Sequence, residues 1–214
     1  MCIRDRPNEP HGILADLPLP VYMTTNYDDF MMRSLRSRGK KPYRELFRWN
    51  SELAKDQSSV FDSQPGYNPT PEEPVIFHLH GHSGVPESLV LTEDDYLDFL
   101  VNISSSQYQL PHWIERALAG STLLFVGYSL ADWNFRVLFR GLVSAREQSL
   151  RYGNFTVQVL PIPANATEED RQQIQRYLDK YFGKIEVRVY WGTAAEFAAE
   201  LRERATAEGI IHGA

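Results

Sequence analysis

The sequence predicts an α/β fold in three layers, in which helices cover both faces of a mostly parallel sheet of about five strands. Short apolar runs typical of strands alternate with amphipathic segments typical of helices along the chain. The run STLLFVG, residues 121–127, is almost continuously apolar, as expected for a strand buried on both faces. Turn and cap residues separate these segments, which supports short connections between strands and helices.

The expected elements follow in chain order. Strands are expected near residues 20–26, 75–80, 121–127, 155–161 and 185–191. Helices are expected over residues 28–39, 91–100, 112–120, 132–147, 167–182 and 193–205, because these segments combine an apolar period with start or stop signals. Residues 40–53 are expected to hold a further helical piece, and residues 58–74 are expected to form a surface loop.

Composition excludes several classes of protein. The chain has 214 residues, 43% of them hydrophobic, which suits one domain with a sizeable core. The net charge of -6 argues against nucleic acid as the main partner. Cys2 is the only cysteine, which excludes an intrachain disulfide and a Cys-rich zinc ribbon. The sequence shows neither a signal peptide nor an apolar run of about 20 residues, so we expect a cytoplasmic protein without a membrane partner.

The N-terminal segment, residues 1–18, is predicted to be irregular. Its first letters, MCIRDR, have no apolar period and no cap signal. They are similar to a translated sequencing-adapter remnant, and the alternative is a frayed polar terminus. The α/β domain is therefore expected over residues 19–214.

Small or polar residues follow three of the predicted strands. Ligands of parallel sheets bind beyond the carboxyl ends of the strands, so these residues are the candidates for a site. They are Thr24, Thr25, Asn26 and Asp28 after the first strand, His80, Gly81 and His82 after the second, and Gly127, Ser129 and Asp132 after the third. Turn and helix-cap chemistry alone would also explain Asn26, Asp28, Gly127, Ser129 and Asp132.

Three motifs in this order resemble the bacterial sirtuin-like domain family. They are TTNYD at residues 24–28, HLHG at residues 78–81 with LVLTEDDY at 89–96, and FVGYSLADWN at 125–134. The resemblance covers roughly residues 19–142 and continues more weakly toward the C-terminus. It implies a Rossmann-like, sirtuin-like fold that binds NAD, and many members of the family hydrolyse NAD in anti-phage defence.

The resemblance also implies roles for individual residues. His80 matches the catalytic histidine, and Asn26 is expected to act with it. The residues expected to bind the cofactor are Thr24, Thr25, Asp28, Gly81, Gly127, Ser129 and Asp132. Asn26 and Asp28 would line the nicotinamide and its ribose, and Gly127 and Ser129 would contact the ribose and phosphates.

Two departures from the family pattern limit these expectations. Nothing before Leu19 resembles the family's first strand and Gly-rich phosphate loop, so we expect that the chain lacks this unit. The four-cysteine zinc module of the deacylases is also absent from the sequence, which argues against an ordinary protein deacylase.

The histidines of PVIFHLHGHSG allow several interpretations. Strand alternation would place His78, His80 and His82 on one face, where they could bind zinc. We expect no metal, because neither an HExxH motif nor a cysteine cluster supports one. A structural role is expected for His78, and an exposed loop position is expected for His82.

Three functions are compatible with these features. The first is hydrolysis of NAD to nicotinamide and ADP-ribose by part of an anti-phage effector. The second is a non-catalytic nucleotide-sensing or assembly module of the same fold, and the third is an NAD-dependent deacylase or ADP-ribosyl transferase. A homo-oligomer and a fused sensor domain are both compatible with the sequence.

Overall fold

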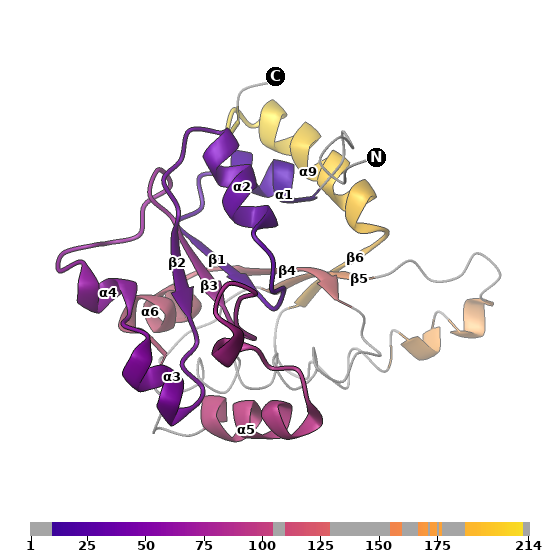
Figure 1. The fold of residues 1–214 in the computed structure, drawn as a ribbon. Helices are drawn as coiled ribbons and strands as arrows, with labels where there is room; N and C mark the ends of the chain where they lie inside the picture. The colour runs from indigo at the N-terminus through magenta and orange to yellow at the C-terminus, as the bar shows by residue number, and fades with distance from the viewer. Residues whose placement is uncertain are drawn as a thin grey trace. The chain divides into compact units, whose positions relative to one another are not determined.

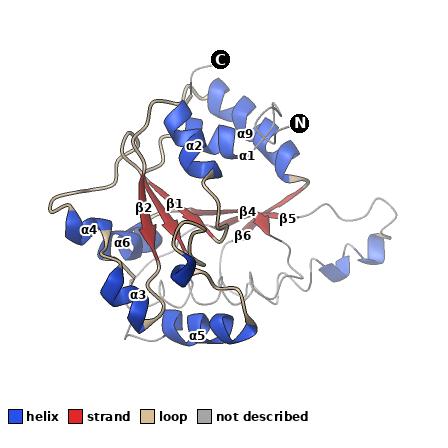
Figure 2. Cartoon of the chain, viewed as in Figure 1, coloured by secondary structure: helices blue, strands red, loops and turns tan. Residues whose placement is uncertain are grey.

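The computed structural model describes residues 10–104, 110–128, 155–159, 167–170, 172–174, 176 and 187–211. The chain divides into two compact units. One comprises Pro10–Ala117 with Arg204–Ala214, and the other comprises Met1–Glu9 with Leu118–Glu203. The described strands pair into two three-stranded sheets, which we describe one at a time (Figures 1 and 2).

The sheet of the first unit contains β1 (Val21–Thr24), β2 (Tyr43–Leu46) and β3 (Val75–His78). The strand order is β1-β3-β2, and both neighbouring pairs are parallel. The register aligns the last residues of all three strands, Thr24, Leu46 and His78, at one edge. All four residues of the central strand β3 are buried, which makes it the centre of the hydrophobic core.

Helices pack on both faces of this sheet. The helical segments of the first unit are α1 (Pro10–Asp16), α2 (Phe30–Ser37), α3 (Ser51–Asp56), α4 (Val60–Ser63), the short 3-10 turn η2 (Pro86–Ser88), α5 (Glu93–Ser104) and α6 (His112–Gly120). The last three residues of α6 belong to the second unit. Met31 and Leu35 of α2 pack with Ile76 of β3 on one face. Phe77, the next residue, points to the other face and contacts Phe47, which packs edge-on against Phe99 of α5.

The sheet of the second unit contains β4 (Leu123–Tyr128), β5 (Phe155–Val159) and β6 (Val187–Trp191). These strands are parallel in the order β4-β5-β6. The β4 register shifts between Phe125 and Tyr128, where Gly127 has a φ of 82°. Helix α9 (Ala194–Ala207) follows β6 and starts with a capping box, in which Thr193 and Glu196 each accept the other's backbone N–H.

All five predicted strands are present within the described residues, but the pairing differs from the prediction. The described strands pair as two sheets of three, where one sheet of about five strands was predicted, and β2 is a strand that the prediction lacked. Residues 43–46 lie within the segment that was expected to be helical. The charged residues Arg44 and Glu45 hide the strand pattern. Asp29 pairs with Arg44, and Glu45 is satisfied by the nearby Arg48 and by the distant Ser59 hydroxyl and Val60 N–H.

The N-terminal prediction also needs correction. Residues 10–16 form α1, whereas the whole of residues 1–18 was expected to be irregular. Pro10 opens the helix at a position that tolerates its missing N–H, and Ile13 and Ala15 are buried. The Tyr22 hydroxyl donates a hydrogen bond to the Leu14 carbonyl at 2.8 Å and ties α1 to β1. Burial raises the pKa of Tyr22 well above its usual value, so the phenol stays a donor.

Candidate functional site

Two loops meet at the carboxyl edge of the first sheet. The Asn26 loop, residues 25–29, follows β1, and the His80 loop, residues 79–90, follows β3. The backbone N–H of Leu79 donates to the Thr24 carbonyl at 2.9 Å, and that of Ser83 donates to the Tyr27 carbonyl at 2.9 Å. The Tyr27 hydroxyl donates to the Val90 carbonyl at 2.6 Å. These bonds hold the two loops side by side, as expected for parallel strands with aligned ends.

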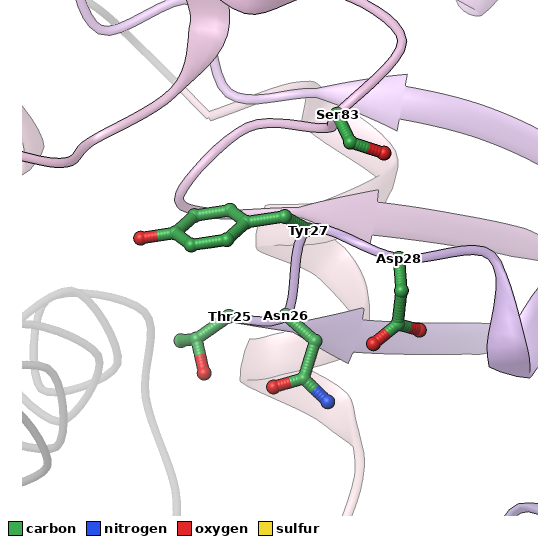
Figure 3. Close-up of a pocket in the computed structure, with 5 residues that line it drawn as sticks. All are labelled: Thr25, Asn26, Tyr27, Asp28 and Ser83. Atoms are coloured by element: carbon green, nitrogen blue, oxygen red, sulfur yellow. The ribbon is translucent and has the colours of Figure 1, made fainter.

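A pocket of about 360 Å³ lies between the two loops. Its lining residues are Thr25, Asn26, Tyr27, Asp28 and Ser83 (Figure 3). In Figure 3 the Asn26 amide and the Asp28 carboxylate extend in the same direction from the Asn26 loop, while Ser83 comes from the His80 loop. The lining offers hydroxyl, amide and carboxylate groups and no basic side chain. Such a pocket suits hydroxyl, carboxamide or cationic groups better than phosphate.

Local backbone contacts position the two polar side chains of the Asn26 loop. The Thr24 hydroxyl accepts a hydrogen bond from the Asn26 backbone N–H at 3.0 Å. One carboxylate oxygen of Asp28 accepts from the Phe30 backbone N–H at 2.8 Å, at the start of α2. The N-cap residue of α2 is Asp29, and the Asp28 carboxylate satisfies the first backbone N–H of the helix from the position before it, which leaves its other oxygen to face the pocket.

His78 ends β3 and is only 1% exposed. Its Nδ1 lies 3.1 Å from the Asn26 carbonyl, which can only accept, so Nδ1–H is the donor. Burial lowers the pKa of His78 to about 4, and the imidazole is neutral at pH 7. These contacts agree with the structural role expected for this histidine, since its ring supports the backbone that carries Asn26.

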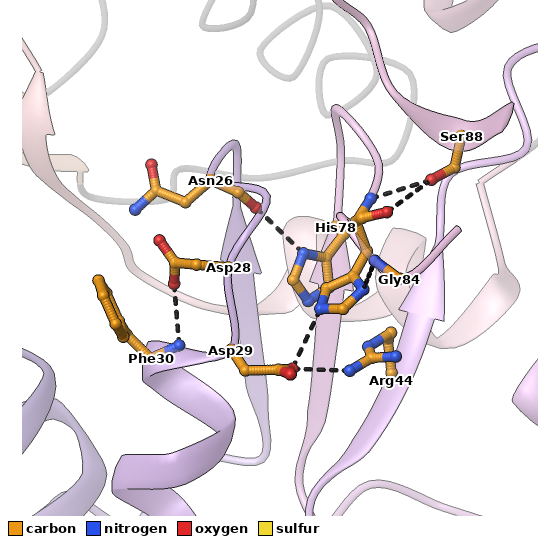
Figure 4. Close-up of polar contacts among 9 residues, drawn as sticks. Asn26, Asp28, Asp29, Phe30, Arg44, His78, Gly84 and Ser88 are labelled. Atoms are coloured by element: carbon orange, nitrogen blue, oxygen red, sulfur yellow. Dashed lines mark hydrogen bonds and ion pairs between the residues drawn. The ribbon is translucent and has the colours of Figure 1, made fainter. Parts of the chain in front are cut away.

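His82 is buried, which corrects the expectation of an exposed loop residue. Its side chain is 4% exposed, and its Nε2 lies 3.1 Å from the Asp29 carboxylate. The Gly84 backbone N–H donates to His82 Nδ1 at 2.9 Å, so the neutral ring carries its proton on Nε2 (Figure 4). The burial follows from a chain reversal at Gly81, where φ is 87°.

Asp29 connects this histidine to β2. Its carboxylate also accepts from Arg44 Nη2 at 2.6 Å, which gives it one partner on β2 and one in the His80 loop (Figure 4). Burial tends to raise the pKa of Asp29, but the hydrogen bonds from Arg44 and His82 and the positive charge of Arg44 outweigh it and hold the pKa below its usual value. The carboxylate is therefore ionised at neutral pH.

His80 lies in a different environment from the other two histidines. It is 8% exposed, and its ring packs edge-on against Phe99 at 4.8 Å and Tyr96 at 5.9 Å, both from α5. The rings of His78 and His82 lie 5.0 Å apart. Strand alternation predicts all three histidines on one face, but only the His78 and His82 rings lie together. His80 departs from the pattern because β3 ends at His78. His80 does not line the pocket, although it lies three residues before Ser83.

The remaining predicted site residues are placed as follows. Thr24 ends β1, and Thr25 lines the pocket. Gly81 lies at the turn of the His80 loop. Gly127 is exposed near the end of β4 in the other unit, and Ser129 and Asp132 lie outside the described residues. The expected convergence of Asn26, His80 and Ser129 therefore stays a prediction.

The sequence reasoning assigned no site role to four residues that the structure brings to this edge: Tyr27, Ser83, Asp29 and Arg44. In the sequence Ser83 is only a small residue shortly after the HG pair, and Arg44 stood in the segment that was predicted to be helical.

Within the described residues, no group of three or more histidine, cysteine or acidic side chains is arranged to hold a metal ion. The described helices also include none that is long and apolar enough to cross a membrane.

The fold and the strand-end site define the class to which this chain belongs. The family model of the SIR2-like domain matches residues 20–185, which is more than half of the chain, and the chain is a member of that family.

Several curated proteins are similar to it. NAD(+) hydrolase ThsA of Acinetobacter baumannii (strain 532279) is 27% identical over 145 residues, covering 68% of this chain and 26% of that protein. NAD(+) hydrolase ThsA of Enterococcus faecium is 29% identical over 128 residues, covering 59% of the chain and 23% of the relative. Defense-associated sirtuin 2 of Bacillus subtilis is 27% identical over 164 residues, covering 74% and 14%. The chain thus spans about a quarter or less of these relatives.

Proposed function

We propose that this chain is the NAD-binding part of a protein that hydrolyses NAD to nicotinamide and ADP-ribose in defence against phage. The observation that carries the proposal is the pocket at the carboxyl edge of the first sheet, where Asn26 and Asp28 extend in the same direction. Two relatives named NAD(+) hydrolase and one named as a defence-associated sirtuin support the substrate and the setting.

The pocket suits the nicotinamide riboside half of NAD. Its volume of about 360 Å³ is at the small end of the roughly 300–1,000 Å³ typical of ligand pockets. The Asp28 carboxylate can accept from a carboxamide NH2 and favours a positively charged pyridinium ring. The Asn26 amide can hold a ribose hydroxyl or the attacking water. Because no basic residue lines this pocket, the pyrophosphate is expected to bind outside it.

The reaction breaks the glycosidic bond between nicotinamide and ribose. Nicotinamide leaves as a neutral molecule from a pyridinium, so no strong general acid is needed. The sugar carbon gains positive charge as the bond breaks, as in glycoside hydrolysis. Water then adds to that carbon and loses a proton, which gives ADP-ribose.

His80 is the proposed base for the water or a ribose hydroxyl. It comes from the same loop as Ser83, which lines the pocket, and Val90 anchors its carbonyl with a backbone hydrogen bond of 3.1 Å. A base has to come within hydrogen-bond distance of the proton that it removes, although such contacts often tighten only when substrate binds. In the structure the His80 ring packs against Phe99, so a role as base requires the ring to approach the pocket when substrate binds.

The test compares NAD turnover by this chain and by a version extended into its native gene, each with and without His80→Ala and Asn26→Ala. We expect His80→Ala to reduce turnover by about 10²-fold or more, the usual contribution of a general base. The exposed His112 provides the control variant His112→Ala, which should retain activity. Turnover that survives His80→Ala would remove His80 from the mechanism.

A second candidate is a nucleotide-sensing module without catalysis. The observation in its favour is that His80 packs against α5 and does not line the pocket. This function predicts that the extended protein binds NAD in calorimetry without releasing nicotinamide. Binding that Asn26→Ala abolishes, with no turnover by the wild type, would favour sensing over hydrolysis.

A further inference from the structure

A chain of polar contacts joins the Asn26 loop, the His80 loop and β2 beside the pocket. Arg44 of β2 donates to Asp29 of the Asn26 loop at 2.6 Å, and His82 of the His80 loop donates to the same carboxylate oxygen at 3.1 Å. The Gly84 backbone N–H donates to the other side of the His82 ring at 2.9 Å. In Figure 4 two of these bonds, the one from Arg44 and the one from the imidazole ring, meet at the Asp29 carboxylate. One carboxylate thus holds the His80 loop against β2 and α2.

The direction of each hydrogen bond is fixed. Gly84 N–H can only donate, so His82 Nδ1 accepts and Nε2–H donates to Asp29. Arg44 can only donate, and only an ionised carboxylate accepts equally well from both partners. An amide in place of Asp29 would keep an accepting oxygen but would leave the Arg44 charge, with a side chain 32% exposed, without its counter-ion.

The tip of the His80 loop depends on these polar contacts. Ser83 and Gly84 are exposed, so little apolar burial fixes their position. The Ser83 backbone N–H donates to the Tyr27 carbonyl at 2.9 Å, between the two neighbours His82 and Gly84, which take part in the contacts to Asp29. The Ser83 side chain lines the pocket that also contains Asn26 and Asp28.

From this geometry we propose that Asp29 is a positioning residue, which holds Ser83 so that its hydroxyl contacts the sugar of the bound nicotinamide riboside group. The proposal rests on the NAD-hydrolysing function proposed above and adds a specificity-determining residue, Ser83, to its site. A serine hydroxyl both donates and accepts, which matches the hydroxyl groups of a ribose. Asp29 acts on the substrate only through the loop that it holds.

The experiment measures steady-state NAD hydrolysis by the extended protein and its variants Ser83→Ala, Asp29→Ala and the double variant. Loss of one neutral hydrogen bond in the ground state should raise KM about fivefold in Ser83→Ala and leave kcat within about twofold. Asp29→Ala should raise KM at least as much. The double variant should add little to Asp29→Ala, because residues that act through one contact are not additive.

Two further variants separate positioning from folding. Asp16→Ala removes another surface aspartate–arginine pair, with Arg38 at 2.8 Å, and should leave KM unchanged because neither residue lines the pocket. Asp29→Asn keeps an acceptor for His82 and should show a smaller rise in KM than Asp29→Ala. If circular dichroism shows that Asp29→Ala is unfolded, Asp29→Asn takes its place in the comparison of KM values.

Each outcome decides a separate question. Unchanged KM in folded Asp29 and Ser83 variants, or fully additive effects, would overturn the positioning role while NAD hydrolysis stands. A fall in kcat with unchanged KM would also overturn it. A wild-type protein that neither hydrolyses nor binds NAD would overturn the proposed function itself, and the positioning role with it.

Discussion

Among the glycines in the described turns, Gly81 is the one whose replacement by alanine should damage the candidate site most. Gly81 has a φ of 87°, a backbone conformation that disfavours a side chain. A Cβ atom built on Gly81 would lie 2.1 Å from the Ser88 carbonyl oxygen and 2.3 Å from its carbon. Ser88 cannot move away easily, because its carbonyl accepts from the Trp49 indole at 3.0 Å and its hydroxyl accepts from the His82 N–H at 2.9 Å.

The size of the effect follows from two contributions. A left-handed backbone costs about 1–2 kcal/mol for a residue with a Cβ atom. Forcing a methyl group into packed surroundings typically costs about 1–3 kcal/mol more. We therefore expect Gly81→Ala to lower the free energy of unfolding by roughly 3 kcal/mol. At about 2–4 °C per kcal/mol for a chain of this size, Tm should fall by roughly 6–12 °C.

Gly66→Ala is the matched control. Gly66 has a φ of 92°, close to that of Gly81, but a Cβ atom added to it would meet nothing within 4 Å. It should therefore show the backbone cost alone, about 1–2 kcal/mol. Urea denaturation of both variants, followed by Trp fluorescence and circular dichroism, measures the difference. Equal destabilisation of the two variants would refute the argument that the Ser88 backbone confines the His80 loop.

Two further predictions concern buried charge. An unfolded histidine binds a proton near its usual pKa of 6.5, whereas burial lowers the pKa of His78 to about 4. The unfolded state therefore binds more protons between these pH values, and the free energy of unfolding should fall by up to about 3 kcal/mol as pH drops from 6.5 to 4. Glu45→Ala should destabilise the protein by about 3–5 kcal/mol, because it leaves Arg48 without its partner and removes the acceptor for the Val60 N–H. Urea titrations across this pH range, and at pH 7 for Glu45→Ala, measure both effects.

Each of these predictions has its own control. His78→Gln keeps a donor for the Asn26 carbonyl but cannot titrate, so the pH slope should flatten in this variant and stay in His112→Gln. An unchanged slope in His78→Gln would contradict the first prediction. Glu52→Ala, on the exposed surface of α3, should change stability by less than about 0.5 kcal/mol. A similarly small effect of Glu45→Ala would contradict the second.

The strands that could be predicted from the sequence are those that their own residues identify, without knowledge of their partners. The apolar runs at β3 and β4 need no partner to be recognised, since their composition alone fits a buried strand. Strand β2 was missed because its charged residues are accommodated with the help of distant partners: Ser59 and Val60 for Glu45, and Asp29 for Arg44. The ion pair of Arg48 with Glu45, by contrast, is local in the sequence.

The candidate site divides in the same way. Asn26 and Asp28 could be predicted, because their place directly after a strand fixes where they lie. The environments of His80 and His82 could not, because strand alternation ends at His78 and the reversal at Gly81 decides where the next side chains point. Ser83 reaches the pocket through the same reversal, which depends on the non-local contacts of Ser88.

The contacts between the two loops have a consequence for how this site can change during evolution. The acceptors at Thr24 and Tyr27 that hold the His80 loop are main-chain carbonyl oxygens, and so is the Asn26 acceptor that holds His78 at the end of β3; every amino acid supplies such a group. Exchanging the side chains of Thr25 or Asn26 leaves these bonds in place. Point mutations at Thr25 or Asn26 can therefore change the groups that the pocket offers to a ligand while these backbone bonds between the two loops remain.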